Sequence, residues 1–246
     1  MVTSPRPPAS RQHRVLGPLA EALVTLAGTP DDASDIADLF VTVARLSADL
    51  VAPVSYASVT VIREGAGTTV AASSDLAAAV DRAQYADGSG PCLEALDVGA
   101  PVGVADVAAT MNWPGFRDQA FRLGLRASLS IPLFAGSGVP VAVLNLYGHD
   151  PTGMAPLTSR VWAVYKPRHP GPDNEDREPL DPGGADLIAG LTGAFAVRAV
   201  VQRAIGVIMA GGNHTPDAAY LILRVRAAEV GVTLVRAATD ILAEPA

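Results

Sequence analysis

The sequence predicts an α+β domain followed by an all-helical unit. Two pairs of segments with alternating apolar residues are joined by short glycine-containing turns, a pattern typical of antiparallel hairpins. Amphipathic helical segments lie before and between these hairpins, so we expect helices packed on an antiparallel sheet. From residue 185 to residue 242 only helical periodicity remains, interrupted once by a Gly-Gly pair.

The first two elements are predicted to be helices. Helical periodicity runs from Val15 to Ala27, where the letters GTPDD interrupt it. Asp31 or Asp32 is suited to cap a second helix over residues 33–51, because a carboxylate accepts hydrogen bonds from the free N–H groups of a first turn. The apolar anchors of that helix are Ile36, Phe40, Val43 and Leu50.

A hairpin and several short elements come next. Residues 56–62 and 68–74 alternate as two strands around an EGAG turn, and an Ala-rich helix is expected over 76–83. A glycine-rich loop leads to Pro91, which suits the first turn of a short helix. The letters APVGVADV predict a strand, and NWPGFRDQAFRLG predict a helix closed by Gly124.

The clearest hairpin lies at residues 126–148. Its strands read RASLSIPLFA and VPVAVLNLYG, and a GSG turn at residues 136–138 joins them. Because consecutive strands joined by tight turns pair with their neighbours, this hairpin fixes the antiparallel character of the predicted sheet.

Composition divides the chain into four parts. We expect a disordered N-terminus at residues 1–14, an α+β domain at 15–165, a linker or insertion at 166–184 and a helical domain at 185–246. The letters KPRHPGPDNEDREPLDPGG of the third part include five prolines and a cluster of charged residues. Such a segment has too little apolar surface to offset the entropy of ordering it.

Charge and cysteine content narrow the function classes. The net charge of −7 argues against general attraction to nucleic acid or to anionic membranes, although five arginines face only four acidic residues from Gly190 onward. The single cysteine, Cys92, excludes an internal disulfide and fits a reducing cytoplasm. We find no stretch of the ~18 to 20 apolar residues that a bilayer span requires, and the N-terminus lacks the pattern of a signal peptide. We therefore expect a cytoplasmic protein with no membrane partner.

The sequence offers no positive case for an enzyme. Its four histidines are scattered without metal-ligand spacing, so no metal site is expected. Cys92 is either a nucleophile or attachment point, or a small apolar residue beneath a helix, and the second interpretation is favoured. The letters DGSGP and GSG lack the Lys-Ser/Thr ending of a phosphate-binding loop. We predict no catalytic residues and no cofactor.

The first half of the chain resembles a GAF domain, a small-molecule sensor fold related to PAS domains. The resemblance covers roughly residues 30–150 and rests on the two leading helices, the hairpin after Tyr56, the letters GSGPCLEAL with PVGVADV, and SLSIPLFAGSGVPVAVLNLYG. It implies either a pocket for an unidentified small molecule between sheet and helices, or a dimerisation platform without a ligand. The residues expected near such a pocket, or filling the core in its place, are Tyr85, Cys92, Leu96, Trp113 and Phe116. Whether a signal enters through a ligand, a partner or oxidation of Cys92 stays open.

Residues 190–243 resemble an ANTAR domain, the three-helix RNA-binding module of transcription antitermination regulators. The letters RAVVQRAIGVIM and TPDAAYLILRVRAAEVGVTLVRAATDIL carry the resemblance without a gap. The order GAF then ANTAR is a pairing familiar from actinobacterial regulators. This chain departs from the family where Ile205 replaces a frequent lysine, where Gly231 replaces a frequent asparagine, and near Thr233, where a basic residue is missing. Its positive charge is therefore thinner.

The first helix of this module has a core face and a polar face on a helical wheel. Its core face consists of Val197, Val200, Val201, Ala204, Ile205 and Ile208. Gly206 lies on the polar face, where glycine costs ~1 kcal/mol relative to alanine. This cost indicates the close approach of RNA or a partner helix, unless Gly206 packs against the first domain. The residues predicted to contact RNA are Arg198, Gln202, Arg203, Gly206, Arg224 and Arg226.

The second helix of the module carries two apolar faces. It begins with Thr215 as N-cap and Pro216 in the first turn. Its core stripe consists of Ala219, Tyr220, Leu223, Ala227 and Val230, while Leu221, Ile222 and Val225 lie on the far face. A helix with two apolar faces needs two partners. The second partner is either the first domain or a second chain, and we favour a homodimer.

These observations leave three functions. The leading one is a ligand-responsive RNA-binding regulator, whose partners are transcript hairpins, a second copy and an unidentified small-molecule effector. The first alternative is a helix-turn-helix DNA regulator. The helix that would enter the major groove carries only Arg236, whereas such helices contact bases with three or four side chains. The second alternative is a dimerisation or signalling module that binds no nucleic acid, which the low basic charge favours.

Overall fold

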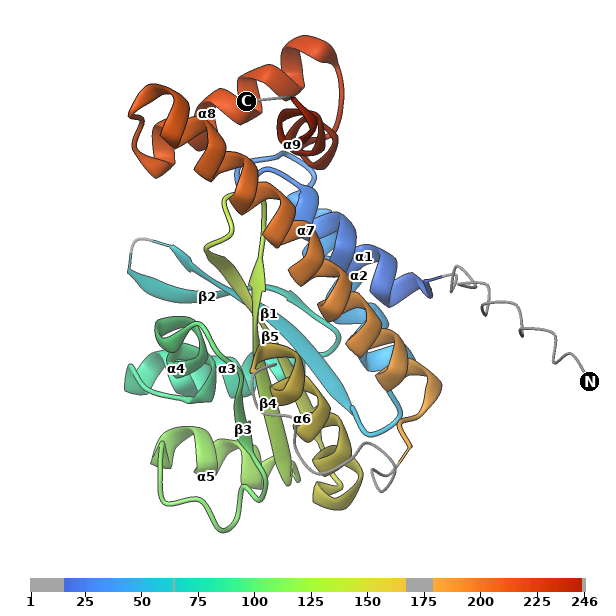
Figure 1. Ribbon diagram of the computed structural model, residues 1–246. Helices are drawn as coiled ribbons and strands as arrows, with labels where there is room; N and C mark the ends of the chain where they lie inside the picture. The colour runs from blue at the N-terminus through green and yellow to red at the C-terminus, as the bar shows by residue number, and fades with distance from the viewer. Residues whose placement is uncertain (1–15, 64, 167–178, 245–246) are drawn as a thin grey trace, which may run out of the picture.

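The computed structural model describes residues 16–63, 65–166 and 179–244 (Figure 1). Its centre is a five-stranded antiparallel sheet, which confirms the predicted α+β fold class. The strands lie in the spatial order β2-β1-β5-β4-β3. Their bounds are β1 Tyr56–Arg63, β2 Ala66–Ala72, β3 Val102–Val104, β4 Ala127–Phe134 and β5 Pro140–Gly148.

Helices cover both faces of this sheet (Figure 1). On one face lie α1 (Pro18–Gly28), α2 (Ile36–Leu50) and α6 (Pro151–Tyr165). On the other face lie α3 (Asp75–Asp87), α4 (Pro91–Val98) and α5 (Pro114–Arg122). The larger apolar core lies on the first face, and two smaller apolar clusters lie on the second.

The alternation of side chains along the central strands separates these two faces. Val59, Ile131 and Leu144 point into the larger apolar core. Their neighbours Ser58, Ser130 and Asn145 are also buried but point to the opposite face, toward α3 and α4. The sheet therefore has an apolar side and a buried polar side.

A single helix, α7 (Pro182–Gly212), joins this sheet domain to the C-terminal bundle (Figure 1). Leu187 and Leu191 in its first half pack into the larger core of the sheet domain. Its second half packs against α8 (Pro216–Val230) and α9 (Leu234–Ala243) in a separate core of ten buried residues. The predicted three-helix unit is therefore present, and its first helix extends into the sheet domain.

Two contacts fix the start of α7. The Asp181 carboxylate caps it by accepting hydrogen bonds from the N–H groups of Gly183 and Gly184, at 3.0 and 3.1 Å. One turn later, the Asp186 carboxylate accepts from the N–H groups of Leu19 and Ala20 in the first turn of α1. Because α1 has no cap from its own N-cap side chain, Asp186 completes that helix from a distant part of the chain.

Several expected features differ in the structure. Helix α2 begins at Ile36 after Asp35, so Asp31 and Asp32 do not cap it. Helix α6 was not predicted at all, because Pro156 interrupts its sequence pattern. Val230, expected in the bundle core, is exposed at the end of α8. The predicted N-terminus at 1–14 and residues 167–178 of the predicted linker lie outside the described residues, while residues 182–184 form the first turn of α7.

Helix α7 is long and apolar enough to cross a membrane by length and composition alone. The expectation that no segment meets this criterion was therefore wrong. The core helix of a globular protein satisfies the same criterion, so it does not identify a span. In this fold, apolar side chains of α7 pack into two different cores, the sheet domain first and the bundle second.

Candidate functional site

A buried polar cluster lies between the sheet and helices α3 and α4. At its centre the Asp81 carboxyl accepts hydrogen bonds from the Tyr147 hydroxyl at 2.5 Å and from the Thr69 hydroxyl at 2.8 Å. The Asn145 amide donates to the Thr60 hydroxyl at 3.0 Å. Asp81, Asn145 and Thr60 are fully buried, so these bonds replace the water that the groups lose on folding.

Burial raises the pKa of the Asp81 carboxyl, because the charged form loses hydration inside the protein. Hydrogen bonds from Tyr147, Ser58 and Thr69, and the charge of Arg82, lower that pKa but do not cancel the effect of burial. The cluster therefore holds a carboxyl that is easier to protonate than an exposed aspartate.

The five residues predicted to line a ligand pocket lie on this same side of the sheet. The Tyr85 hydroxyl is within 2.8 Å of the Thr60 hydroxyl and 2.9 Å of the Thr69 hydroxyl, so Tyr85 belongs to the polar cluster. Leu96 and Trp113 pack around Cys92, and Trp113 also packs against the fully buried Phe116. The five divide between the polar cluster and two apolar clusters, and protein atoms surround Cys92 and Phe116 completely.

Cys92 is a buried thiol. Its Sγ atom lies 3.4 Å from the Asn145 amide, and its backbone N–H donates to the Gln84 side-chain oxygen at 2.9 Å. Burial raises the pKa of the thiol to about 12. Because the thiolate is the reactive form, these surroundings favour a packing role over a nucleophilic one.

The C-terminal bundle is built from well-capped helices. The Thr215 hydroxyl accepts from the N–H of Ala218, and the Thr233 hydroxyl accepts from the N–H of Arg236, at the starts of α8 and α9. Asn213 and Gly231 adopt left-handed conformations at the ends of α7 and α8. The predicted Thr215 cap is therefore confirmed.

Two of the six predicted RNA contacts lie open on α7. Arg203 is exposed, and within the described residues its side chain has no hydrogen bond or ion pair. Gly206 is exposed too, and a Cβ atom built on it meets no atom within 4 Å. The alternative that Gly206 packs against the first domain is therefore wrong, since open space lies beside it.

Two others on α7 contact the tip of the β4–β5 hairpin. The Arg198 Nε atom donates to the backbone carbonyl of Gly138 at 2.8 Å, and its guanidinium lies 4.0 Å from the centre of the Phe134 ring. The Gln202 amide donates to the backbone carbonyl of Ser137. These two side chains share the polar face of α7 with Gly206, as predicted, but carbonyl groups of the hairpin tip already accept from the Arg198 Nε and from the Gln202 amide.

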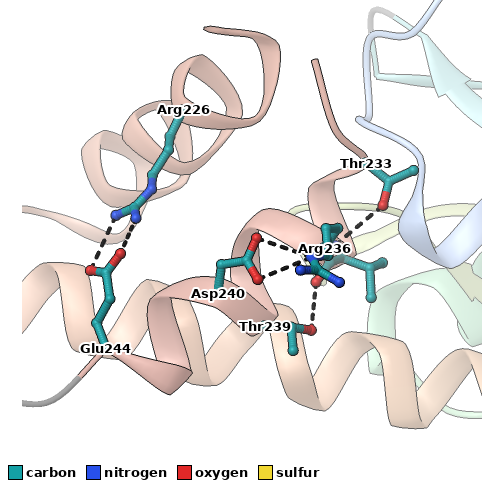
Figure 2. Close-up of polar contacts among 7 residues, drawn as sticks. Arg226, Thr233, Arg236, Thr239, Asp240 and Glu244 are labelled. Atoms are coloured by element: carbon teal, nitrogen blue, oxygen red, sulfur yellow. Dashed lines mark hydrogen bonds and ion pairs between the residues drawn. The ribbon is translucent and has the colours of Figure 1, made fainter. Parts of the chain in front are cut away.

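The arginines of α8 and α9 all have acidic partners. Arg224 pairs with Asp32 in the α1–α2 loop at 2.7 Å. Arg226 pairs with Glu244, and Arg236 pairs with Asp240 one turn along α9 at 3.0 Å (Figure 2). Figure 2 shows the Arg226 and Arg236 pairs on separate parts of the bundle. Each pair is exposed to solvent, so an incoming phosphate can compete for the arginine.

The second apolar face of α8 is uncovered in a single chain. Leu221, Ile222 and Val225 are 57%, 39% and 47% exposed. The alternative that the first domain covers this face is therefore wrong. Leu221 and Val225 instead line an open groove whose other wall is the α1–α2 loop.

Comparison with known families decides what these two parts are. A GAF domain family model matches residues 33–159, which is about half of the chain, and an ANTAR domain model matches residues 189–242. The chain is a GAF and ANTAR domain-containing protein. In this GAF and ANTAR domain-containing protein, the GAF match ends before α7 and the ANTAR match begins inside it, so the first turns of α7 lie in neither match. Both are regulatory domain families, and the ANTAR family is known for RNA-binding antitermination modules.

Other comparisons give fewer results. A domain of a two-component sensor histidine kinase protein from Sinorhizobium meliloti 1021 aligns with 68% of this GAF and ANTAR domain-containing protein and 92% of its own chain, at 18% identity and a TM-score of 0.37. None of the curated proteins compared with the chain matches it. Among the described residues, no three histidine, cysteine, aspartate or glutamate side chains gather as metal ligands do.

Proposed function

We propose that this protein is an RNA-binding transcription antitermination regulator, whose GAF domain senses a small ligand or a partner. The observation that carries the proposal is the open surface of α7 inside the ANTAR match, where Arg203, which has no partner among the described residues, lies one turn before Gly206. An arginine supplies charge-assisted hydrogen bonds to phosphate, and a glycine lets a backbone approach closely. The ligand of this surface is a structured RNA, the hairpins of a nascent transcript.

The proposal assigns no catalytic step to the protein. It acts in the cytoplasm, and its output is the blocking of transcription termination through RNA binding. The input is an unidentified small molecule or partner at the GAF domain, near Tyr85 and the other residues of the predicted pocket. Cys92 is poorly suited to receive a redox signal, because its thiol is buried and its pKa is raised.

The same proposal includes a homodimer. The exposed side chains of Leu221, Ile222 and Val225 give α8 an apolar strip on its outer face. A second copy that packs its own α8 against this strip removes the apolar surface from water and presents two α7 faces to a pair of RNA hairpins. An isologous contact of this kind closes on itself and stops at two chains.

The helix-turn-helix alternative is less well supported. Its would-be reading helix is α9, where Arg236 is the base-reaching candidate, and Asp240 holds that guanidinium. Proteins that recognise a DNA sequence insert several such side chains into the major groove. The proposal therefore expects a preference for RNA over duplex DNA.

A binding titration tests the proposed function. The purified full-length protein is titrated with a labelled RNA that folds into two adjacent hairpins, and with a duplex DNA of the same sequence. The proposal predicts tighter binding to the RNA, and weaker binding by Arg203→Ala. Arg45→Ala is the matched control, because Arg45 is also an exposed arginine and lies on α2 of the GAF domain. If the duplex DNA binds as tightly, or if the two variants bind RNA equally, the proposed surface is wrong.

A further inference from the structure

Two segments of the GAF domain reach the ANTAR bundle. They are the α1–α2 loop, residues 29–35, and the tip of the β4–β5 hairpin, residues 135–139. Figure 1 shows this tip beside the middle of α7. We call the contacts that these two segments make with α7, α8 and α9 the sensor–bundle interface.

The hairpin tip presents backbone acceptors to α7. The carbonyl groups of Ser137 and Gly138 accept hydrogen bonds from Gln202 and Arg198, respectively. The Phe134 ring at the base of the tip lies against the Arg198 guanidinium. Arg198 is thus held by a hydrogen bond and a cation–π contact together.

The α1–α2 loop presents carboxylates to α8. Asp32 pairs with Arg224, and Asp31 accepts a hydrogen bond from the Tyr220 hydroxyl at 3.4 Å. Asp31 also accepts from the N–H of Ser137 at 2.9 Å, which ties the loop to the hairpin tip. The loop and the hairpin tip therefore form one continuous surface that contacts the bundle.

The fit at the hairpin tip is close. A Cβ atom built on Gly136 lies 2.5 Å from the Tyr220 hydroxyl and 2.8 Å from a methyl group of Leu234. Both distances are too short for real atoms, so a side chain at this position must push Tyr220 and Leu234 aside, and it also meets the Thr29 carbonyl oxygen at 3.0 Å. A single methyl group at this position opposes the docked arrangement without changing any charge.

These contacts use side chains that the proposed function assigns to RNA. Arg198, Gln202 and Arg224 all donate to GAF-domain acceptors, whereas Arg203 and Gly206 stay open. An arginine held by a carbonyl group or a carboxylate cannot offer the same N–H groups to a phosphate. We infer that the structure shows an autoinhibited state, in which the sensor–bundle interface covers half of the RNA-binding face. This inference rests on the proposed RNA-binding function.

The interface is weak enough to open. Its ion pair joins Arg224 and Asp32, whose side chains are 32% and 65% exposed, and exposed pairs contribute little to stability. The apparent affinity for RNA falls in proportion to the fraction of molecules in the open state. Breaking the interface should therefore tighten RNA binding by about threefold to fivefold, the factor that corresponds to a weak contact.

The test compares variants of the full-length protein that break the interface in two different ways. Asp31→Asn/Asp32→Asn removes its carboxylates, and Gly136→Ala introduces the steric clash. The matched control is Asp38→Asn/Asp49→Asn, which removes two exposed carboxylates of α2 that lie outside the sensor–bundle interface. Each protein is titrated with the same two-hairpin RNA. We expect the first two variants to bind about threefold to fivefold more tightly than wild type, and the control to change binding by less than about 1.5-fold.

The outcomes separate this inference from the proposed function. If wild type binds RNA and the two interface variants bind it equally or more weakly, the autoinhibited state is wrong while the RNA function stands. If the control tightens binding as much as Asp31→Asn/Asp32→Asn, general charge repulsion is the cause, and the inference is again overturned. If none of the proteins binds RNA even at low salt, both fail. Should Gly136→Ala not fold, the two carboxylate variants decide, because each removes two negative charges and only Asp31→Asn/Asp32→Asn breaks the interface.

Discussion

The GAF domain buries its polar chemistry, whereas the ANTAR bundle exposes it. In the GAF domain, Asp81, Asn145 and Thr60 lie in a closed hydrogen-bonded cluster beneath the sheet. In the bundle, the core is apolar and rich in alanine, and the arginines lie on the outside. A buried cluster of this kind responds to what enters the protein interior, while an exposed set of arginines responds to what arrives from solvent. The difference is what we expect if the GAF domain receives the signal and the ANTAR bundle delivers the response.

The two regions meet at few points. Strand β5 contributes Asn145 and Tyr147 to the polar cluster, and the hairpin that it forms with β4 ends at the tip that holds Arg198. The α1–α2 loop makes a second connection through Asp31 and Asp32, and helix α7 supplies a third, since its two halves pack into the two cores. A change in the GAF domain therefore has a short covalent route to the RNA-binding face.

The largest expected effect is on the small core of the bundle. Leu223→Ala removes a fully buried side chain from a core of ten buried residues, and should destabilise the bundle by roughly 2–5 kcal/mol. Val225→Ala on the same helix is the control, because Val225 is half exposed and should cost less than about 1 kcal/mol. Urea unfolding measures both. Equal losses would show that α8 does not rest on this core.

The buried carboxyl of the GAF domain should make stability depend on pH. Because its pKa is raised in the folded state, the unfolded chain releases this proton first, and stability falls as pH rises above the ordinary aspartate pKa of 3.8. The slope reaches at most ~1.4 kcal/mol per pH unit. Asp81→Asn should remove this slope, and Asp75→Asn, at an exposed position of α3, should keep it. Urea unfolding from pH 4 to pH 8 checks this, and parallel curves for wild type and Asp81→Asn would contradict it.

The exposed strip of α8 should control self-association. Val225→Glu should weaken the dimer by about tenfold or more, because it places a charge in an apolar contact. Val98→Glu is the control, since Val98 is a comparably exposed valine on α4 of the GAF domain. Sedimentation at micromolar concentration measures the dimer. A wild-type protein that stays monomeric with and without RNA would show that the proposed homodimer does not form.

The smallest expected effect separates two glycines of α7. Gly206→Ala and Gly211→Ala should each stabilise the helix by up to ~1 kcal/mol, because a Cβ at either position meets open space. Only Gly206 lies on the proposed RNA-binding face, so only Gly206→Ala should weaken RNA binding. Thermal unfolding and RNA titration of the two variants test this together. Equal RNA affinities would show that close approach is not the reason for Gly206.

The elements of the fold could be predicted largely from sequence because most have strong local signals. The GSG turn, the Thr215 cap and the alternation of β1, β4 and β5 all act within a few residues. Helix α6 escaped prediction because the interior Pro156 resembles a helix breaker, although Asp150 caps the helix in the expected way. Turns and helix caps, which depend on a few neighbouring residues, were predicted well. A single proline inside α6 was enough for that helix to be missed.

The candidate sites were harder to predict because their contacts join distant parts of the chain. Asp81 and Asn145 are 64 residues apart, and Asp32 and Arg224 are 192 residues apart. A signal for the polar cluster did exist, since Ser58, Ser130 and Asn145 occupy alternate positions that point to one face of neighbouring strands. No comparable local signal marks the sensor–bundle interface, where Asp31 and Asp32 resemble helix caps.

Hydrogen exchange of the full-length protein with and without hairpin RNA tests the central claim most directly, because it follows both sides of the sensor–bundle interface at once. The account predicts slower amide exchange along the part of α7 around Arg203 and Gly206 when RNA is added. It also predicts faster exchange at residues 29–35 and 135–139, since RNA must displace the loop and the hairpin tip to reach Arg198 and Arg224. Protection of α7 with unchanged exchange in those two segments would contradict the competition between RNA and the GAF domain. Protection elsewhere, with none on α7, would contradict the RNA-binding face itself.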